Sequence, residues 1–344
     1  MTSCPRCGAR AIRDHDDVIC LSCGTLATPR RPTDAVWEPP RGESGHYTCA
    51  HCGREFWRDA GQIRRELRRR PYARLYCRPE CAQEAAKTRR QTLMEALYHA
   101  EPGIRIYHGD ARAIVPAIVG SYTVDHVFTD PPYSPETHAG AQGAGGKRPA
   151  GELVDFAPMA AAEIGEVLGQ AKPRRWVVAT TDYRHVLELQ DRTPAGLKFI
   201  RFGVWVKPDS APQFTGDRPA QGWEGVAILH GVHAGPPRWN SGGDRAVWVH
   251  ARARPAHHPT EKPIGLIRQW ILQFTDPGDL ILDPFMGSGV VLRAAKDLGR
   301  QAIGIEIEER WCAHARDRLA QTVFEFAFDE SPPEPAPVAA EATV

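Results

Sequence analysis

Short apolar runs alternate with stretches of helical periodicity from about residue 101 to residue 321 of this 344-residue chain. The runs expected to form strands are 104–108, 125–129, 175–180, 199–206, 225–230, 280–283 and 302–307. Helical periodicity covers 111–119, 155–169, 183–190, 264–274, 289–298 and 309–321. Strands that alternate with helices predict an α/β fold in which a mostly parallel sheet is covered on both faces. Such sheets bind ligands beyond the carboxyl ends of their strands.

Cysteines and charges divide the chain into segments. Eight of the nine cysteines precede residue 82, and the last twenty residues carry five acidic and no basic side chains. We therefore expect a zinc-ribbon-like module at 1–30, a linker at 31–45, a second zinc module with a basic helix at 46–100, an α/β body at 101–324 and a disordered acidic tail at 325–344.

The first four cysteines have the spacing of a structural zinc site. Two Cys-x2-Cys pairs are separated by twelve residues, namely Cys4, Cys7, Cys20 and Cys23. A two-residue gap lets a tight turn direct both thiolates to one tetrahedral ion. So short a segment has too little core to fold without a metal, which disfavours the alternative of four unligated thiols. We expect one structural Zn²⁺ here.

A second group of cysteines predicts a second structural Zn²⁺. Its members are Cys49, Cys52, Cys77 and Cys81, with a three-residue spacer in the second pair. His46 and His51 are alternative ligands that four cysteines make unnecessary. Between residues 54 and 90, twelve basic residues stand against five acidic ones. Since arginine pairs with phosphate and reaches base edges, this module is a candidate DNA reader, and the alternative is a solvated helix face.

The run Asp283-Pro-Phe285-Met-Gly287-Ser-Gly289 links an expected strand to a helix. Glycines in such a turn let the backbone come close to a ligand, and Glu306, 23 positions after Asp283, ends the next strand. An acidic side chain at about that distance accepts hydrogen bonds from ribose hydroxyls. Because the three-glycine dinucleotide pattern is absent, we expect a smaller adenosine-bearing cofactor.

A second strand end carries the run Asp130-Pro131-Pro132-Tyr133. The prolines have no N–H to donate and leave their carbonyls free to accept. A carboxylate, a free carbonyl and an aromatic ring together suit a planar base that bears an exocyclic amino group. The alternative for this run alone is a rigid loop.

These segments together resemble the S-adenosylmethionine-dependent amino DNA methyltransferases that modify adenine N6 or cytosine N4. The resemblance is to the permuted β-type, in which the D-P-P-Y motif precedes the cofactor turn. The matching segments are Gly109-Asp110, 130–133, 258–263, 283–289 and 304–306, and the match spans about residues 104–319. The cysteine-rich front lies outside it. The family implies a Rossmann-like sheet of seven strands with one antiparallel strand.

The resemblance also implies roles for individual residues. Asp130 and the Pro131 carbonyl would accept the two N–H bonds of the target amine, and Tyr133 would stack on the flipped-out base. Pro132 completes the catalytic loop. The residues implied at the cofactor are Asp110 (adenine), Glu306 (ribose), Thr260 and Lys262 (methionine end), and Asp283, Phe285, Gly287 and Gly289 (pocket). For Lys262 the alternative is a solvated lysine at a helix start.

Three choices of substrate follow from the motifs. Methylation of cytosine C5 is disfavoured, because it needs a cysteine nucleophile, usually in a Pro-Cys pair, and the chain has no such pair. Adenine N6 is favoured over cytosine N4, because cytosine-N4 members more often place Ser where Asp130 stands. An RNA substrate, and a zinc-dependent DNA-binding protein with an inert methyltransferase body, are the rival functions.

Two regions besides the basic zinc module are expected to contact DNA. The glycine-rich segment 134–151 follows the catalytic loop and is expected to be a mobile loop with Lys147 and Arg148 on phosphate, unless it is a disordered insertion. The expected recognition region is 208–259, which contains Arg218 and Trp223.

Partners and location follow from composition and from the family. The net charge of +1 gives no overall polyanion signal, and no apolar run reaches the ~20 residues that span a bilayer. The N-terminal residues lack the apolar run of a signal peptide. We therefore expect a cytoplasmic, nucleoid-associated protein with double-stranded DNA as partner and no membrane partner. A restriction endonuclease is a candidate further partner.

Overall fold

A computed structural model describes residues 44–69, 75–133, 158–212, 216–232, 236–254 and 261–321, and the backbone of four short strands before residue 28. The chain divides into two compact units, Met1–Arg41 and Gly42–Val344. Most of the expected linker, the expected mobile loop 134–151 and the tail 325–344 lie outside the described residues.

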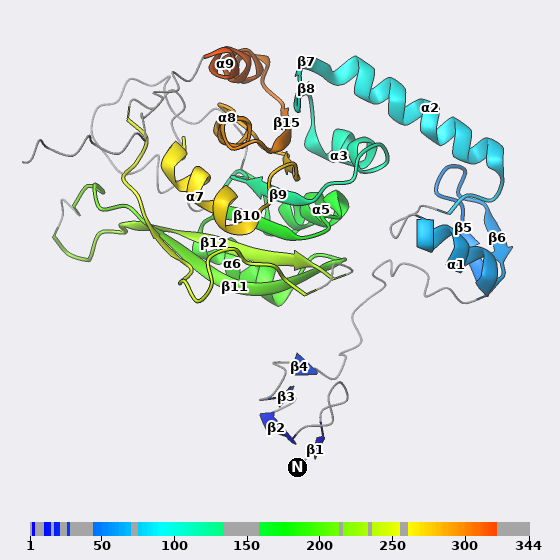
Figure 1. Cartoon of the computed structure of the whole chain (residues 1–344), viewed down its shortest axis with the longest axis horizontal. Helices are drawn as coiled ribbons and strands as arrows, with labels where there is room; N and C mark the ends of the chain where they lie inside the picture. The colour runs from blue at the N-terminus through cyan, green and yellow to red at the C-terminus, as the bar shows by residue number, and fades with distance from the viewer. Residues whose placement is uncertain are drawn as a thin grey trace, which may run out of the picture. The chain divides into compact units, whose positions relative to one another are not determined.

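The first unit is a small antiparallel sheet in the order β1-β2-β3-β4. Its strands are β1 (Thr2–Ser3), β2 (Arg10–Asp14), β3 (Asp17–Cys20) and β4 (Leu26–Ala27) (Figure 1). Of the four cysteines predicted to bind zinc here, Cys4, Cys7 and Cys23 lie outside the described residues, and only the backbone of Cys20 is described. The first zinc site therefore stays a prediction.

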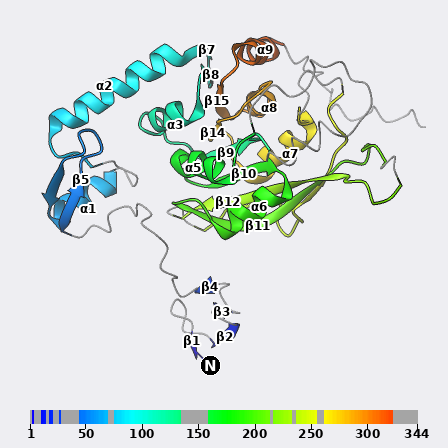
Figure 2. The same cartoon turned by 180° about the vertical axis from the view of Figure 1, so that it is seen from behind.

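The second unit begins with a hairpin of β5 (Gly45–Thr48) and β6 (Glu55–Arg58), followed by α1 (Ala60–Arg69). The helix α2 (Pro79–Ala96) starts with proline at its first position, where no intrahelical hydrogen bond is lost. It ends where β7 (Leu97–Glu101) begins, so that it runs from the hairpin to the main sheet (Figures 1 and 2).

A mixed sheet forms the centre of the second unit. Its remaining strands are β8 (Ile104–His108), β9 (His126–Thr129), β10 (Trp176–Thr181), β11 (Leu197–Val206), β12 (Trp223–Gly231), β13 (Val247–Val249), β14 (Leu280–Asp283) and β15 (Gln301–Glu306). The strand order is β13-β11-β12-β10-β9-β14-β15-β8-β7. The five neighbours β10, β9, β14, β15 and β8 are parallel, and β13 pairs in parallel with β11. β12 is antiparallel to β10 and β11, and β7 is antiparallel to β8.

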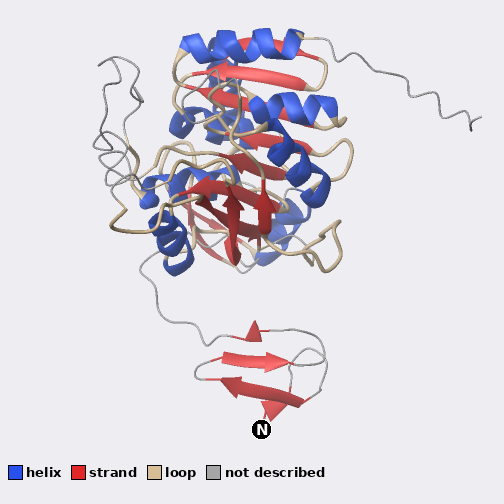
Figure 3. Ribbon diagram, turned by 90° about the vertical axis from the view of Figure 1, so that its left-hand side faces the viewer, coloured by secondary structure: helices blue, strands red, loops and turns tan. Residues whose placement is uncertain are grey.

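Helices cover both faces of this sheet (Figure 3). They are α3 (Ala111–Val119), α5 (Ala161–Ala171), α6 (Tyr183–Asp191), α7 (Ile264–Phe274), α8 (Val290–Asp297) and α9 (Glu309–Ala320). One core joins α3, α5 and α6 through Ile114, Leu168 and Val186. The other joins α7, α8 and α9, with Trp270 and Leu292 among its members. β9 and β10 are buried at every position, as expected for parallel strands covered on both sides.

The number of strands corrects the sequence prediction of seven. The described part of the chain forms a main sheet of nine strands, two of which, β7 and β12, are reversed. β7 is added because Gly103, at φ +78°, allows a tight turn that returns the chain beside β8. β13 is added because it pairs with the end of β11. At five and three residues, neither segment has a long apolar run that predicts a strand.

Among the described residues, no helix has both the length and the apolar character needed to cross a membrane.

Candidate active site

A cavity of about 300 Å³ lies at the carboxyl ends of β8, β9, β14 and β15. Its lining includes Asp110 after β8, Asp130 after β9, the run 283–288 that starts at the last residue of β14, and Glu306 at the end of β15. Lys262, from the segment before α7, completes this set. Residues far apart in the sequence therefore share one space, at the edge of the sheet where parallel strands bind ligands.

Asp130 is held through both carboxylate oxygens. Oδ1 accepts a hydrogen bond from the Thr180 hydroxyl at 2.7 Å, and Oδ2 accepts one from the Lys262 ammonium at 2.5 Å. The first contact follows from the sheet, because Thr180 belongs to β10, which pairs with β9. A carboxylate offers about four lone-pair positions, so this one is oriented and can still accept from a ligand.

The Tyr133 hydroxyl lies between two carboxylates. Its oxygen is 2.7 Å from Glu224 Oε2 and 3.2 Å from Asp130 Oδ1. Since a hydroxyl has one proton to donate, the shorter contact with Glu224 is the better hydrogen bond. The other Glu224 oxygen accepts from the Lys207 ammonium at 2.8 Å, and Lys262 Nζ lies 3.4 Å from Glu224 Oε2. Two carboxylates and two ammonium groups thus surround the D-P-P-Y segment.

Burial and charge compete over the ionisation of this network. Desolvation raises the pKa of Asp130 above its ordinary value, an effect that the Lys262 ammonium opposes and the Glu224 carboxylate strengthens. Burial also acts to raise the pKa of Glu224, but Lys262 and Lys207 outweigh it and lower that pKa to about 2. For Lys262, burial acts to lower the pKa, and the two carboxylates raise it above the ordinary value. Lys262 is therefore a cation that favours the ionised form of Asp130.

Asp283 is a buried carboxylate at the start of the expected cofactor turn. It accepts hydrogen bonds from the Thr129 hydroxyl at 2.8 Å and from the Phe285 N–H at 3.2 Å. Burial raises the pKa of Asp283 to about 7, and the carboxylates of Asp130 and Glu306 add to that rise. A cationic ligand in the cavity would offset this concentration of negative charge.

Glu306 closes the turn from the neighbouring strand. Its Oε2 accepts from the Gly287 N–H and its Oε1 from the Glu308 N–H, both at 2.9 Å. Burial raises the pKa of Glu306. Gly287 has φ +47°, in the left-handed region that favours glycine. Glu306, the side chain that the sequence predicts at the ribose, is thus hydrogen-bonded to the backbone of the turn.

Asp110 caps the first turn of α3. Its carboxylate accepts from the backbone N–H of Arg112 at 2.8 Å and pairs with the Arg112 guanidinium at 2.7 Å. These hydrogen bonds with Arg112 lower the pKa of Asp110. Both side chains line the cavity, so the carboxylate predicted at the adenine is charged and partly engaged.

Replacing Gly289 by alanine should destabilise the protein. The residue has φ +75°, and a Cβ there would lie 2.6 Å from Ala315 Cβ in α9. The backbone strain and the overpacking together should cost about 2–4 kcal/mol of unfolding free energy, measured by denaturant titration. Gly299→Ala is the matched control, since Gly299 has φ +69° with nothing within 4 Å of the added Cβ. Equal losses in the two variants would contradict a role for close packing against α9.

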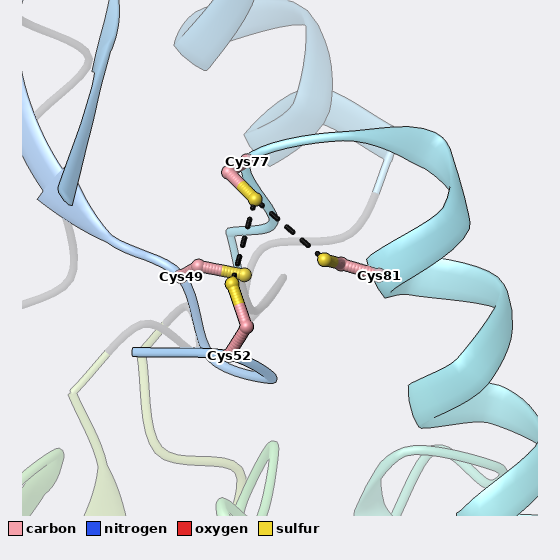
Figure 4. Close-up of side chains that lie close together, drawn as sticks. All are labelled: Cys49, Cys52, Cys77 and Cys81. Carbon is pink, nitrogen blue, oxygen red and sulfur yellow. Dashed lines mark hydrogen bonds between the residues drawn. The ribbon is translucent and has the colours of Figure 1, made fainter. Parts of the chain in front are cut away.

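The four cysteines of the second module lie together beside the β5–β6 hairpin and the start of α2 (Figure 4). Their sulfur atoms all lie within 4.8 Å of one another, and Cys77 Sγ is 3.6 Å from both Cys52 Sγ and Cys81 Sγ. Thiolates bound tetrahedrally at about 2.3 Å from Zn²⁺ would be about 3.8 Å apart, so the cluster fits this ion. Neither His46 nor His51 belongs to the cluster found among the described residues.

The remaining predicted site residues are only partly described. Lys147, Arg148 and Thr260 lie outside the described residues. Arg218 is exposed and pairs with the adjacent Asp217. It is therefore accessible from solvent but does not line the cavity.

Trp223, at the start of β12, belongs to a group of aromatic side chains near the carboxyl end of β10. Its ring centroid lies 6.4 Å from those of Tyr183 and Phe202. The side chains of Tyr183 and Phe202 are exposed, so this part of the surface offers flat aromatic rings to solvent.

Sequence reasoning missed several groups around Asp130. The sequence motifs assign no role to Thr180, Lys207 or Glu224. These residues could be recognised only by their place in the sheet. Thr180 lies near the end of β10 and pairs with Val226 of β12, which comes two residues after Glu224. This signal could be used only once the pairing of β10 with β12 was known.

Comparisons with known proteins place these motifs in context. A family model described as DNA methylase matches residues 234–317. The type II methyltransferase M.XycI of Xanthomonas campestris pv. cyanopsidis is 36% identical over 127 residues, which are 34% of this chain and 42% of that protein. This chain thus spans less than half the length of that relative. The putative methylase YubD of Escherichia coli (strain K12) is 30% identical over 220 residues, which are 63% of this chain and 90% of that protein.

Among solved structures, the crystal structure of the M1.HpyAVI-SAM complex is similar, with 27% identity and a TM-score of 0.49. The alignment covers 63% of this chain and 100% of that one.

Proposed function

We propose that this chain, which belongs to the N6/N4 amino DNA methyltransferase family, transfers a methyl group from S-adenosylmethionine to an exocyclic amino group in double-stranded DNA. One observation carries the proposal: Asp130 and Pro132 line the same cavity as the turn 283–288 and Glu306. An acceptor for an amine and the expected cofactor pocket therefore share one space. The order of the two motifs along the chain supports the permuted β-type.

The cavity suits a cationic adenosine cofactor. Asp283 and Glu306 are carboxylates whose pKa values burial raises, so a positive charge nearby would stabilise their ionised forms. S-adenosylmethionine, when bound, supplies an activated methyl group on a positively charged sulfur. Glu306 would hold the ribose and Asp110 the adenine side, while Phe285 shapes the pocket.

The D-P-P-Y segment would hold the nucleophile. The reacting nitrogen of a base is weak because its lone pair is delocalised into the ring. Asp130 and the Pro131 carbonyl would accept its two N–H bonds, which directs the lone pair toward the methyl group and stabilises the transition state. Tyr133 would stack on the base after it leaves the duplex.

We propose adenine N6 as the target, with cytosine N4 as the second candidate. The carboxylate at position 130 supports adenine, because cytosine-N4 members of the family more often have serine there. Mass spectrometry of nucleosides from duplex DNA treated with the protein tests this choice. We expect N6-methyl-2′-deoxyadenosine, and N4-methyl-2′-deoxycytidine alone would assign the other base. A parallel reaction with duplex RNA tests whether RNA is the substrate. If neither DNA nor RNA is methylated, the alternative of a DNA-binding protein with an inert methyltransferase body is supported.

The zinc modules would increase the affinity for DNA. We propose structural zinc at both cysteine groups and a phosphate-binding role for the basic residues of the second module. The type II relative M.XycI also makes a restriction endonuclease a candidate partner.

Removing exposed arginines from α1 should flatten the salt dependence of DNA binding. Arg64 and Arg65 are exposed, and their guanidinium groups bond to backbone carbonyls of their own helix. Each lost phosphate contact lowers the slope of log affinity against log salt by about 0.9, so the double Gln variant should lose up to about 1.8. Titrations at several salt concentrations measure this slope. Arg316→Gln on α9 is the control, and equal slopes for all three proteins would contradict the role.

A further inference from the structure

Lys262 joins three elements at one buried point. Its side chain is 4% exposed, and Nζ lies 2.5 Å from Asp130 Oδ2, 3.2 Å from the Tyr133 hydroxyl and 3.4 Å from Glu224 Oε2. Asp130 and Tyr133 are the two ends of the D-P-P-Y segment, and Glu224 belongs to β12. One ammonium group therefore contacts both polar side chains of the catalytic loop and the strand that supports it.

The contacts of Lys262 do not match the position that its motif suggested. The family resemblance puts this lysine at the methionine end of the cofactor, and it does line the shared cavity. Its closest contact, however, is the carboxylate that would receive the target amine. A lysine that already pairs with two half-buried carboxylates is poorly placed to neutralise the carboxylate of a bound methionine group as well.

We propose that Lys262 is a positioning residue of the target-amine site. Its ammonium fixes the Asp130 carboxylate in its ionised, accepting form and, together with Glu224, fixes the Tyr133 ring. The inference rests on the proposed function, since it assigns a role in the same reaction.

The need for such a cation follows from the chemistry of the acceptor. A protonated carboxyl group would present an O–H donor to the amine and would have less capacity to accept. The N–H groups of the amine would then lack the acceptor that they need. Burial pushes Asp130 toward that form, as does the Glu224 carboxylate, and the Asp283 carboxylate lines the same cavity. Thr180 donates a hydrogen bond but no charge, and the Tyr133 hydroxyl is neutral at the pH of interest because burial raises its pKa well above the ordinary value.

A pH–rate profile distinguishes this role from the alternatives. In Lys262→Met, kcat should fall by on the order of 10²-fold, and the acidic limb of the profile should move to higher pH, because Asp130 has lost its cation. The dissociation constant for S-adenosylmethionine, measured by calorimetry without DNA, should change by less than about tenfold. Lys262→Arg should restore much of the wild-type profile.

Two further variants test the sign and the distance of the effect. Glu224→Gln removes a carboxylate that raises the pKa of Asp130, so its acidic limb should move to lower pH, opposite to Lys262→Met. Lys207→Met removes an ammonium group that donates to Glu224 rather than to Asp130. The acidic limb of its pH–rate profile should therefore move less than that of Lys262→Met. Thermal unfolding of each variant shows whether it is folded at the assay temperature, and Lys262→Arg and Glu224→Gln carry the test if Lys262→Met does not fold.

The proposal would be overturned if Lys262→Met bound the cofactor more weakly while the acidic limb of its pH–rate profile stayed in place. That result would assign Lys262 to the methionine end of the cofactor. An equal shift in Lys207→Met, or a shift of the same sign in Glu224→Gln, would also overturn it. A wild-type protein that methylates no DNA would instead refute the proposed function, which is a separate outcome.

Discussion

Asp130→Ala is expected to lower kcat by at least about 10²–10³-fold while cofactor affinity changes little. The carboxylate is placed to accept from the target amine, and removing one preorganised hydrogen-bonding group of this kind typically costs that much. Cofactor binding should persist, because Asp283 ends β14 and keeps its hydrogen bonds to Thr129 and to the turn that follows. Single-turnover kinetics and calorimetry measure the two effects separately.

The same substitution should also reduce stability, which the experiment must separate from catalysis. It removes one of two carboxylates beside the buried Lys262 ammonium, and breaking a buried pair costs about 3–5 kcal/mol. Asp130→Asn is the control, because it keeps the size of the side chain and a carbonyl acceptor but removes the charge. A folded Asp130→Ala protein with near-normal turnover would contradict the assignment.

Cys81→Ser is expected to release one zinc ion per chain and to unfold the segment around the β5–β6 hairpin. Within residues 44–81, the buried apolar side chains of the described residues are Cys49, Ile63, Leu75 and Cys81. So small a core contributes little to the folding free energy of this module. The binding of structural zinc contributes about 10–16 kcal/mol in small modules. Elemental analysis by plasma mass spectrometry gives the zinc content, and limited proteolysis detects the unfolded segment.

Cys312→Ser is the matched control for the metal measurement. Cys312 is a buried free cysteine in α9 and lies outside the cluster. It should retain the zinc content of the wild-type protein. If both predicted sites are filled, the wild type should hold two ions and Cys81→Ser one. A wild-type protein without zinc, or a Cys81→Ser protein that keeps the full content, would contradict a structural zinc at this cluster.

The central strands were predictable because they are buried on both faces. The runs at β8 and β14 were bounded correctly, since each is a short run rich in apolar residues that begins soon after a glycine turn. β7 and β13 were not predictable in the same way. Leu97–Glu101 mixes exposed and half-buried positions, and Val247–Val249 has one buried residue, so their pairing depends on the neighbouring strand rather than on their own pattern.

The motifs located the site, but its charge network depended on tertiary structure. The positions of Asp130 and Asp283 at strand ends followed from the sequence, because strand order and turn residues determine which edge they occupy. The pairing of Lys262 with Asp130 joins residues 132 positions apart. Nothing local in the run 258–263 distinguishes a lysine that reaches the amine site from one at the cofactor. Glu224 and Lys207 likewise gain their role from the neighbouring strands β11 and β12.

Methyl transfer from S-adenosylmethionine with a deuterated methyl group tests most directly whether one cavity serves both the cofactor and the amine. After a single turnover on duplex DNA, mass spectrometry should find the label on an exocyclic amino group of one nucleoside. The Asp130→Ala protein, at equal cofactor occupancy, should give little or no labelled nucleoside. Label on carbon 5 of cytosine, or transfer by Asp130→Ala at the wild-type rate, would contradict the shared cavity as the site of reaction.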